Sequence, residues 1–123
     1  MSTTINLFRN EKDVLTFAAG QTIFSKGDPG DVMYAIQDGE VEIYVNDHMI
    51  DSHGPGGIFG EMAIIDASPR SATAVAKTDC TIVPITQQRF EFLVQQTPRF
   101  AVNVMRVMAE RLRKRMAALA ADL

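Results

Sequence analysis

FGEMAIIDASPRSAT, residues 59–73, is the stretch that decides how the rest of this sequence is interpreted. Gly60 lets the backbone approach a ligand, and the apolar helical turn after it begins with N–H groups that have no partner within the turn and attract an anion. The carboxylate of Glu61 only accepts hydrogen bonds at neutral pH, which suits a hydroxyl group. Arg70 can place its forked guanidinium on a phosphate, beside the hydroxyl of Ser71. Together they predict a site for a phosphate held rigidly next to a sugar hydroxyl, the shape of a cyclic phosphodiester on ribose.

On both sides of this segment, residues 14–86 alternate short apolar runs with turn residues, which is typical of a roll, barrel or sandwich. Residues 40–45 alternate most clearly, with Val41, Ile43 and Val45 on one face and Glu42 and Tyr44 on the other. The expected strands are Val14–Phe17, Thr22–Phe24, Val32–Ile36, Glu40–Val45, Met49–Ile50, Ala72–Ala76 and Cys80–Ile85. Residues 54–57 are expected to form a loop.

The hydrophobic period changes after residue 85. Thr86 is expected to cap a helix over about residues 86–96, and Pro98 is expected at the first position of a second helix over about residues 98–121. This second helix carries one expected apolar stripe, made of Val104, Met108, Leu112, Met116, Leu119 and Leu123. The stripe can pack on its own domain or pair with a second copy of the chain. The fold class is therefore mainly β with C-terminal helices.

Composition limits the possible functions. The chain has 123 residues, a net charge of −3, 46% apolar residues and 22% charged residues, which fits one folded domain. An acidic chain has no general attraction for nucleic acid or anionic lipid, so neither is expected as a partner. The longest apolar runs are interrupted, for instance by Glu61 and Asp66, and no signal peptide is visible, so we expect no membrane span and a cytoplasmic protein.

Neither metal chemistry nor nucleophilic catalysis is indicated. His48 and His53 lie five residues apart, which places them on opposite faces of a regular strand, and no third ligand is evident. No Ser/His/Asp arrangement is supported. Cys80 is the only cysteine and lies in an apolar run, so we expect a buried, unreactive thiol. The sequence predicts no metal, no catalytic residue and no enzyme activity.

Residues 57–74 resemble the phosphate-binding cassette of the cyclic nucleotide-binding domain family. Phe59–Ile65 and Pro69–Thr73 match the family pattern nearly position for position, and the family's turn and following strand are matched at Gly27–Asp31 and Asp38–Val41. The resemblance extends over residues 14 to about 112. It implies a single domain over residues 1–123, built as an antiparallel, jelly-roll-like β-roll (a double-stranded β-helix) over about residues 14–86. A short helix in the cassette and the two C-terminal helices complete the expected fold.

The resemblance also implies a sensor that binds cAMP or cGMP as its ligand, needs no cofactor and signals by repositioning its C-terminal helix. In that role Glu61 would hold the ribose 2′-hydroxyl, and Arg70 would hold the cyclic phosphate. Four backbone N–H groups and one side chain would help Arg70, namely those of Gly60, Met62, Ala63 and Ala72 and the hydroxyl of Ser71. The last helix would cap the base through Met108, Arg111, Leu112 and Arg115.

Two departures from the family shape the expected partners. The usual N-terminal helical pair is missing or reduced to Ile5–Glu11, and no output segment is recognised. The signal would then pass to a separate effector protein or to a second copy through the C-terminal helix, unless the chain belongs to something larger.

Two alternatives to a nucleotide sensor are an ordinary surface ion pair between Glu61 and Arg70, or a scaffold of the same fold that has lost its ligand. A serine at position 71 is similar to the residue that bacterial cAMP-binding members have there, but it does not decide between cAMP and cGMP as the ligand.

Overall fold

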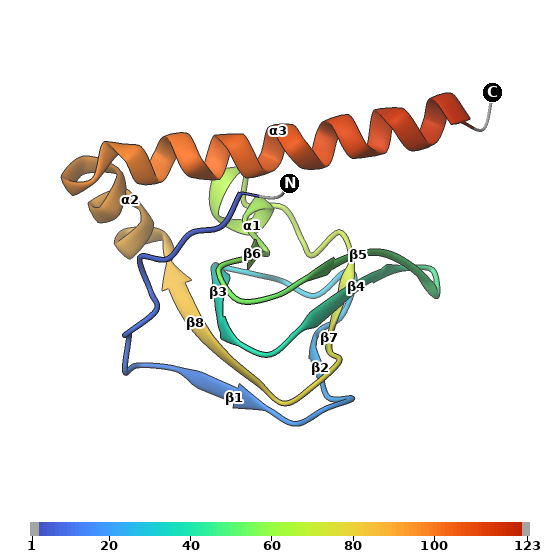
Figure 1. The fold of residues 1–123 in the computed structure, drawn as a ribbon, viewed down its shortest axis with the longest axis horizontal. Helices are drawn as coiled ribbons and strands as arrows, with labels where there is room; N and C mark the ends of the chain where they lie inside the picture. The colour runs from blue at the N-terminus through green and yellow to red at the C-terminus, as the bar shows by residue number, and fades with distance from the viewer. Residues whose placement is uncertain (1–2, 122–123) are drawn as a thin grey trace.

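The structure, a computed structural model, describes residues 3–121 and is a roll of two antiparallel sheets with helices along one side (Figure 1). The first sheet has the order β1 (Leu15–Phe17), β8 (Cys80–Thr86), β3 (Val32–Asp38), β6 (Ile58–Phe59). The second has the order β2 (Thr22–Phe24), β7 (Thr73–Ala76), β4 (Val41–Val45), β5 (His48–His53). The helices are α1 (Met62–Ile65), α2 (Gln87–Gln96) and α3 (Pro98–Ala121). The predicted fold class is confirmed.

Two strands differ most from the sequence prediction, and the bounds of the others shift by at most two residues. Residues 54–57 do form a loop, but Ile58 and Phe59 then pair with Ala35 and Tyr34 as β6, which is too short to show an alternating pattern. Strand β5 is longer than the two residues expected and contains a β-bulge at Ile50, because Ile43 pairs with Asp51 while Tyr44 pairs with Met49. The bulge breaks the alternation on which a sequence reading of β5 depends.

The first sheet is buried on both faces, which divides the core into two clusters. Inside the roll, Ile36 and Ile82 pack with Val41 and Phe59. On the other face of the same sheet, Met33, Val83 and Ile85 pack with residues of the N-terminal segment and of α3. Strand β8 therefore serves both clusters, and it connects directly to α2. Because this sheet carries α2 and α3, the position of the helices is tied to the wall of the roll.

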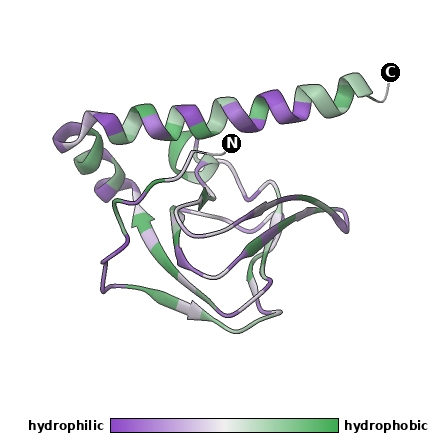
Figure 2. Cartoon of the chain, viewed as in Figure 1, coloured by the Kyte–Doolittle hydropathy of each residue, from purple (hydrophilic) through white to green (hydrophobic). Residues whose placement is uncertain are grey.

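Helix α3 lies along the roll and runs past it at its C-terminal end (Figure 1). The single apolar stripe expected on this helix is wrong: Val104 is buried and Met108 packs on the core, whereas Leu112, Met116 and Leu119 are exposed. Figure 2 shows apolar (green) segments both on the part of α3 that lies along the roll and on the part that runs past it. The buried residues Phe100, Val104 and Val107 mark the side of α3 that faces the core, and the exposed apolar residues lie on a different side of the helix. Leu123 lies outside the described residues.

The N-terminal segment packs on the helices without being helical itself. Residues 7–10 form turns, and Ile5 and Phe8 are buried beside Phe100 of α3. The side chain of Gln37, at a bulge in β3, donates hydrogen bonds to the carbonyl oxygens of Phe8 (3.2 Å) and Glu11 (2.8 Å). The segment is thereby fixed to both the roll and α3.

Two further observations concern the chain as a whole. Across residues 3–121, no helix has an apolar stretch of the length that crossing a bilayer requires. Cys80 is buried, and burial is the largest of the influences that raise the pKa of its thiol, as expected for an unreactive cysteine.

Replacement of Gly39 by alanine is expected to destabilise the protein more than the same change at Gly20. Both glycines have left-handed backbones, with φ of +91° and +88°, so each alanine carries about 1–2 kcal/mol of strain. A Cβ at Gly39 would also meet the carbonyl oxygen of Asp79 and lie 2.8 Å from Cys80 Sγ, whereas a Cβ at Gly20 meets nothing within 4 Å. Urea denaturation of both variants measures the difference; equal losses would show that the Gly39 turn adjusts freely.

Candidate functional site

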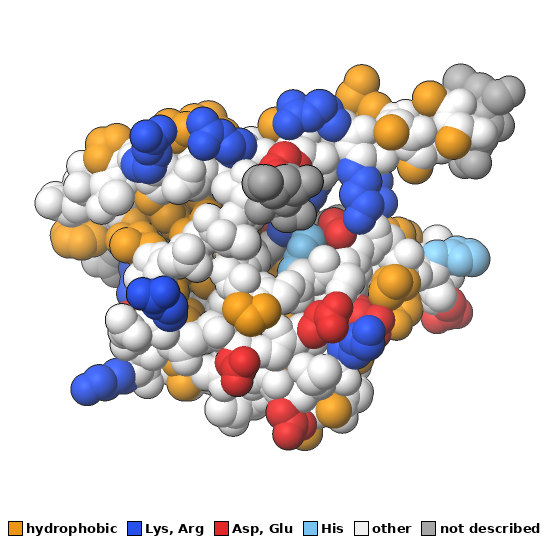
Figure 3. Space-filling model, viewed as in Figure 1, with side chains coloured by type: hydrophobic (Ala, Val, Ile, Leu, Met, Phe, Trp, Pro, Cys, Tyr) orange, Lys and Arg blue, Asp and Glu red, His pale blue; other side chains and the backbone are white. Residues whose placement is uncertain are grey.

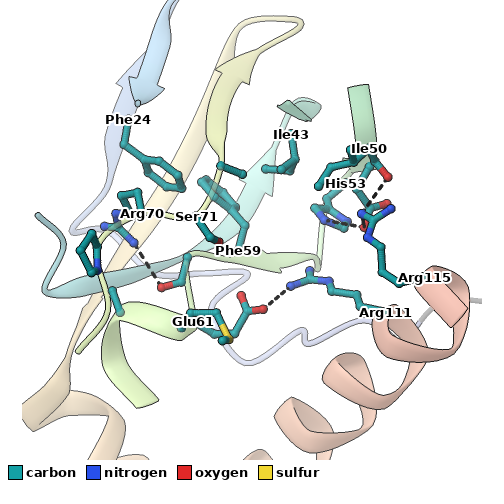
Figure 4. Close-up of a pocket in the computed structure, with 16 residues that line it drawn as sticks. Phe24, Ile43, Ile50, His53, Phe59, Glu61, Arg70, Ser71, Arg111 and Arg115 are labelled. Carbon is teal, nitrogen blue, oxygen red and sulfur yellow. Dashed lines mark hydrogen bonds and ion pairs between the residues drawn. The ribbon is translucent and has the colours of Figure 1, made fainter. Parts of the chain in front are cut away.

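A cavity of about 190 Å³ lies between the cassette, the second sheet and α3 (Figure 4). All seven residues predicted for phosphate and sugar line it: Gly60, Glu61, Met62, Ala63, Arg70, Ser71 and Ala72. Of the four predicted base-capping residues, Arg111 and Arg115 line the cavity. Met108 packs on the core and Leu112 is exposed, so neither reaches the cavity in this structure. Phe24, Ile43, Ile50 and Phe59 supply its apolar walls.

Arg70 is buried, with 7% of its surface exposed, at one end of the cavity (Figure 4). Its guanidinium carbon lies 4.2 Å from the ring centre of Phe24 and 5.6 Å from that of Tyr34, within cation–π range. Its terminal nitrogens donate to the carbonyl oxygens of Val32 (2.8 Å) and Gly60 (3.2 Å). The Nε of Arg70 has no acceptor among residues 3–121, so this buried cation has one unsatisfied donor.

Two glycines leave the space that the guanidinium occupies. A Cβ at Gly30 would meet Arg70 Nε and lie 2.6 Å from its Cζ, and a Cβ at Gly60 would lie 2.7 Å from Nη1. The turn before Gly30 also holds the backbone of Arg70, because Arg70 N donates to Asp28 O (2.8 Å) and Gly27 N donates to Arg70 O (2.7 Å). The Gly27–Asp31 turn, visible in the sequence without an assigned role, therefore positions Arg70.

Glu61 lies between the Arg70 end of the cavity and α3. It precedes the first residue of α1, but its side chain makes no capping hydrogen bond, so the carboxylate points elsewhere. Its Oε1 accepts a hydrogen bond from Arg111 Nη1 at 2.7 Å, and the two side chains are 9% and 22% exposed. Arg111 also donates to the carbonyl oxygen of Ile58. The acid of the cassette is thus joined to the last helix by a largely buried ion pair.

One turn further along α3, two more cations contact β5. Lys114 Nζ lies 2.9 Å from Asp51 Oδ1, and Arg115 donates to the carbonyl oxygen of Ile50 at 2.9 Å. The Asp51 side chain is only 11% exposed. Its second carboxylate oxygen, Oδ2, lies 3.6 Å from His53 Nε2. Although burial raises the pKa of Asp51, the hydrogen bond from Lys114 and the nearby charges lower it overall. Three cations on one face of α3 therefore hold the helix over the cavity mouth.

His53 lies at this same end of the cavity, and the sequence did not indicate it as a site residue. Burial, and next the charge of Arg111, lower its pKa to about 4, so the imidazole is neutral at pH 7. The prediction that His48 and His53 face opposite sides assumed a regular strand and is wrong, because the Ile50 bulge pairs them with Val45 and Val41, which share one face of β4. No three His, Cys, Asp or Glu side chains in residues 3–121 are grouped to hold a metal ion.

The arrangement separates three kinds of chemistry along one cavity. A buried arginine and the Ser71 hydroxyl lie at one end beside Phe24, a carboxylate that can accept from a hydroxyl lies in the middle, and Ile50 with the α3 arginines lies at the other end. Such a cavity can bind a small organic anion through its phosphate and a neighbouring hydroxyl. The residues that the sequence missed, Phe24, Asp51 and His53, have no local pattern that would single them out.

Comparison with known proteins gives a consistent result. The family model described as Cyclic nucleotide-binding domain matches residues 14–97. A cAMP-dependent protein kinase regulatory subunit from Eremothecium gossypii is 41% identical over 71 residues, 58% of this chain and 16% of that protein. Among solved structures, Thermus thermophilus Catabolite Activator Protein has a TM-score of 0.78 at 29% identity, covering 88% of this chain and 53% of that one. The chain thus spans about a sixth of the curated relative.

A third similar protein is an enzyme that has been solved with two different nucleotides. The EAL enzyme Bd1971 in its cAMP-bound form has a TM-score of 0.62 at 34% identity, covering 88% of this chain and 30% of that one. Its cGMP-bound form matches with a TM-score of 0.64 at 35% identity.

His53→Gln is expected to flatten the dependence of stability on pH. In the unfolded chain a histidine titrates near pH 6.5, so between pH 6.5 and about 4 the unfolded state binds more protons than the folded state, and stability falls as pH is lowered. At pH 5 this amounts to roughly 2 kcal/mol relative to pH 7. Urea denaturation at both pH values should show that His53→Gln loses this difference while His48→Gln, at an exposed position, keeps it. Parallel behaviour of the two variants would contradict a buried neutral His53.

Proposed function

The chain belongs to the cyclic nucleotide-binding domain family, and we propose that it binds cAMP in the cavity beneath α3 and signals by moving that helix. The observation that supports this most strongly is that Glu61 and Arg70 are buried in the same cavity, each held by its own set of contacts. A buried guanidinium that lines the same cavity as a carboxylate able to accept from a hydroxyl favours a phosphate joined to a sugar.

In this proposal the cyclic phosphate lies against Arg70, with the hydroxyl of Ser71 beside it. Further hydrogen bonds to the phosphate come from four backbone N–H groups, those of Gly60, Met62, Ala63 and Ala72. Glu61 accepts a hydrogen bond from the ribose 2′-hydroxyl, which an ionised carboxylate does well and which it could not do for a phosphate oxygen. The residues of the chain bind and orient the ligand, and no bond of the nucleotide is broken.

Ligand entry requires α3 to move. Ligand pockets in proteins usually have volumes of roughly 300–1,000 Å³, whereas this cavity has about 190 Å³. Glu61 is already occupied by Arg111, so the ribose hydroxyl competes with the helix for the same carboxylate. Displacement of Arg111 weakens the attachment of α3 to the roll, and the helix takes a new position. This competition is the step that would convert binding into a signal.

The end of the cavity near α3 would receive the base. Arg111 and Arg115 already line that end, whereas Met108 and Leu112 would reach it only after α3 has shifted. The similarity to a kinase regulatory subunit named for cAMP supports adenine, and the EAL enzyme that has been solved with either nucleotide makes cGMP the essential comparison. The regulatory role implies no catalysis by this chain and an output through a separate effector protein or a second copy.

Isothermal titration with cAMP and cGMP tests the proposal. A ligand of this size is expected to bind with a Kd near the micromolar range, so about 100 µM of nucleotide should give clear heat, larger for cAMP. Arg70→Leu should weaken binding by at least about a hundredfold, because the phosphate loses its buried cation. Arg99→Leu, which removes an exposed cation, should bind normally. No heat with either nucleotide would mean that the fold serves as a scaffold.

Since Arg70 also packs against Phe24, a second variant separates folding from binding. Gly30→Ala inserts a methyl group where the guanidinium lies, and its backbone needs no left-handed conformation. We expect a thermally stable protein with weakened nucleotide binding, whereas Gly54→Ala, whose added Cβ meets nothing within 4 Å, should bind like the wild type. Normal affinity in Gly30→Ala would show that the position of Arg70 is unimportant.

Arg111→Ala is expected to tighten cAMP binding by about tenfold, because Glu61 is then free of its competitor. Arg113→Ala removes an exposed arginine two residues away on α3 and is the matched control. Calorimetric titration of the two variants measures the difference. Weaker binding in Arg111→Ala would instead identify Arg111 as a ligand-contacting residue, as the family resemblance implies.

A further inference from the structure

Helix α3 carries a second apolar face that points away from the roll. Its large exposed members are Val102, Met105, Leu112, Met116 and Leu119, between 37% and 68% exposed. With Ala109 they recur at alternating intervals of three and four residues, the spacing of a seam between two supercoiled helices. The core of the protein uses a different side of the helix, through Phe100, Val104 and Val107. This second face is therefore available to another helix.

The far part of this face has no support from its own domain. Arg115 is the last residue of α3 that bonds to the roll in the described structure, and the helix continues to Ala121 (Figure 1). Met116 and Leu119 lie on that continuation and are among the most exposed apolar residues of the chain. A free helix end with exposed apolar residues gains little stability by itself, since helices depend on tertiary packing. A partner helix would supply that packing.

A row of arginines runs beside the apolar face. Arg99, Arg106 and Arg113 are spaced seven residues apart, are exposed and make no hydrogen bond or ion pair with any part of residues 3–121. The space-filling view shows Lys and Arg side chains along the outer edge of α3 (Figure 3). The whole chain has a net charge of −3, so this row is a local reversal of charge. It is the position from which charged residues select the partner in paired helices.

We propose that this face of α3 binds an amphipathic helix of another protein that places Glu or Asp opposite Arg99, Arg106 and Arg113. Charge argues against a second copy that pairs α3 with α3. Helix α3 has one acidic residue, Glu110, which accepts hydrogen bonds from the Thr3 N–H at 2.9 Å and 3.0 Å. Antiparallel self-pairing sets the arginine rows against each other, and parallel self-pairing sets them against positions 101, 108 and 115, which are Ala, Met and Arg. Neither supplies a carboxylate.

The test uses the complete 123-residue protein and two designed helical peptides of about four heptads with identical apolar seams. One peptide carries Glu and the other Lys at the flanking positions, and binding is followed by fluorescence anisotropy in the absence of nucleotide. The Glu peptide should bind at least tenfold more tightly than the Lys peptide. Arg106→Glu with Arg113→Glu should reverse this preference, whereas Arg9→Glu with Lys12→Glu, at exposed sites elsewhere, should leave it unchanged. Leu112→Asp should abolish binding of both peptides.

Three results would overturn the proposal. Equal affinity for the two peptides, or no binding to either, would remove the role of the arginines. Sedimentation that shows a dimer abolished by Leu112→Asp would make a second copy the occupant. Binding to phosphatidylserine vesicles without binding to the Glu peptide would make a membrane surface the occupant. None of these measurements depends on nucleotide binding, so the peptide site and the nucleotide site can fail separately.

Discussion

The ion pair between Glu61 and Arg111 is the contact on which the behaviour of the rest of the molecule depends. It joins the cassette to α3 at 2.7 Å, and both side chains are largely buried, so both charged groups have lost most of their contact with solvent. Two such charges are stable only while both remain paired, because removal of one leaves the other buried and unpaired. A ligand that offers Glu61 a hydroxyl can replace Arg111 there, while Arg111 can return to solvent at the helix surface. The pair is therefore a natural point of exchange between ligand and helix.

Arg70 differs because it is built into the fold. The Gly27–Asp31 turn holds its backbone, two aromatic rings face its guanidinium, and Gly30 and Gly60 leave the room it fills. Such a residue is preorganised, so a phosphate that binds it meets a cation already in place. The phosphate end of the cavity is rigid and the α3 end is held by exchangeable ion pairs. This asymmetry lets one ligand anchor at the first end and act on the second.

Much of this could be predicted from sequence because it depends on local pattern. The alternation at Val41 and Ile43 predicted β4, Thr86 predicted the start of α2, where its side chain accepts a hydrogen bond from Arg89 N, and the motif over residues 59–73 indicated residues that line one cavity. Strand β6 was missed because two residues have no period. An alternating run, a capping residue and a motif each leave a local signal in the sequence, whereas a two-residue strand leaves none.

What could not be predicted depends on tertiary placement. The apolar positions of α3 divide into a buried side and an exposed side, and helical spacing contains no information about which side the sheet covers or where that cover ends. Arg111 was expected at the base and lies on Glu61, since a long side chain reaches whatever charge the fold brings near it. Asp51 and His53 became site residues through the bulge at Ile50, which no residue type in that segment announces.

The most direct test of the account is the distance between α3 and β5 before and after nucleotide is added. Spin labels at Asp47→Cys, in the turn before β5, and at Ala117→Cys, near the end of α3, lie at exposed sites, and Cys80 is buried. The account predicts that saturating cAMP shifts the measured distance distribution, and that Arg70→Leu in the same background does not shift at that concentration. An unchanged distribution in a protein that demonstrably binds cAMP would contradict the claim that the nucleotide competes with α3 for Glu61.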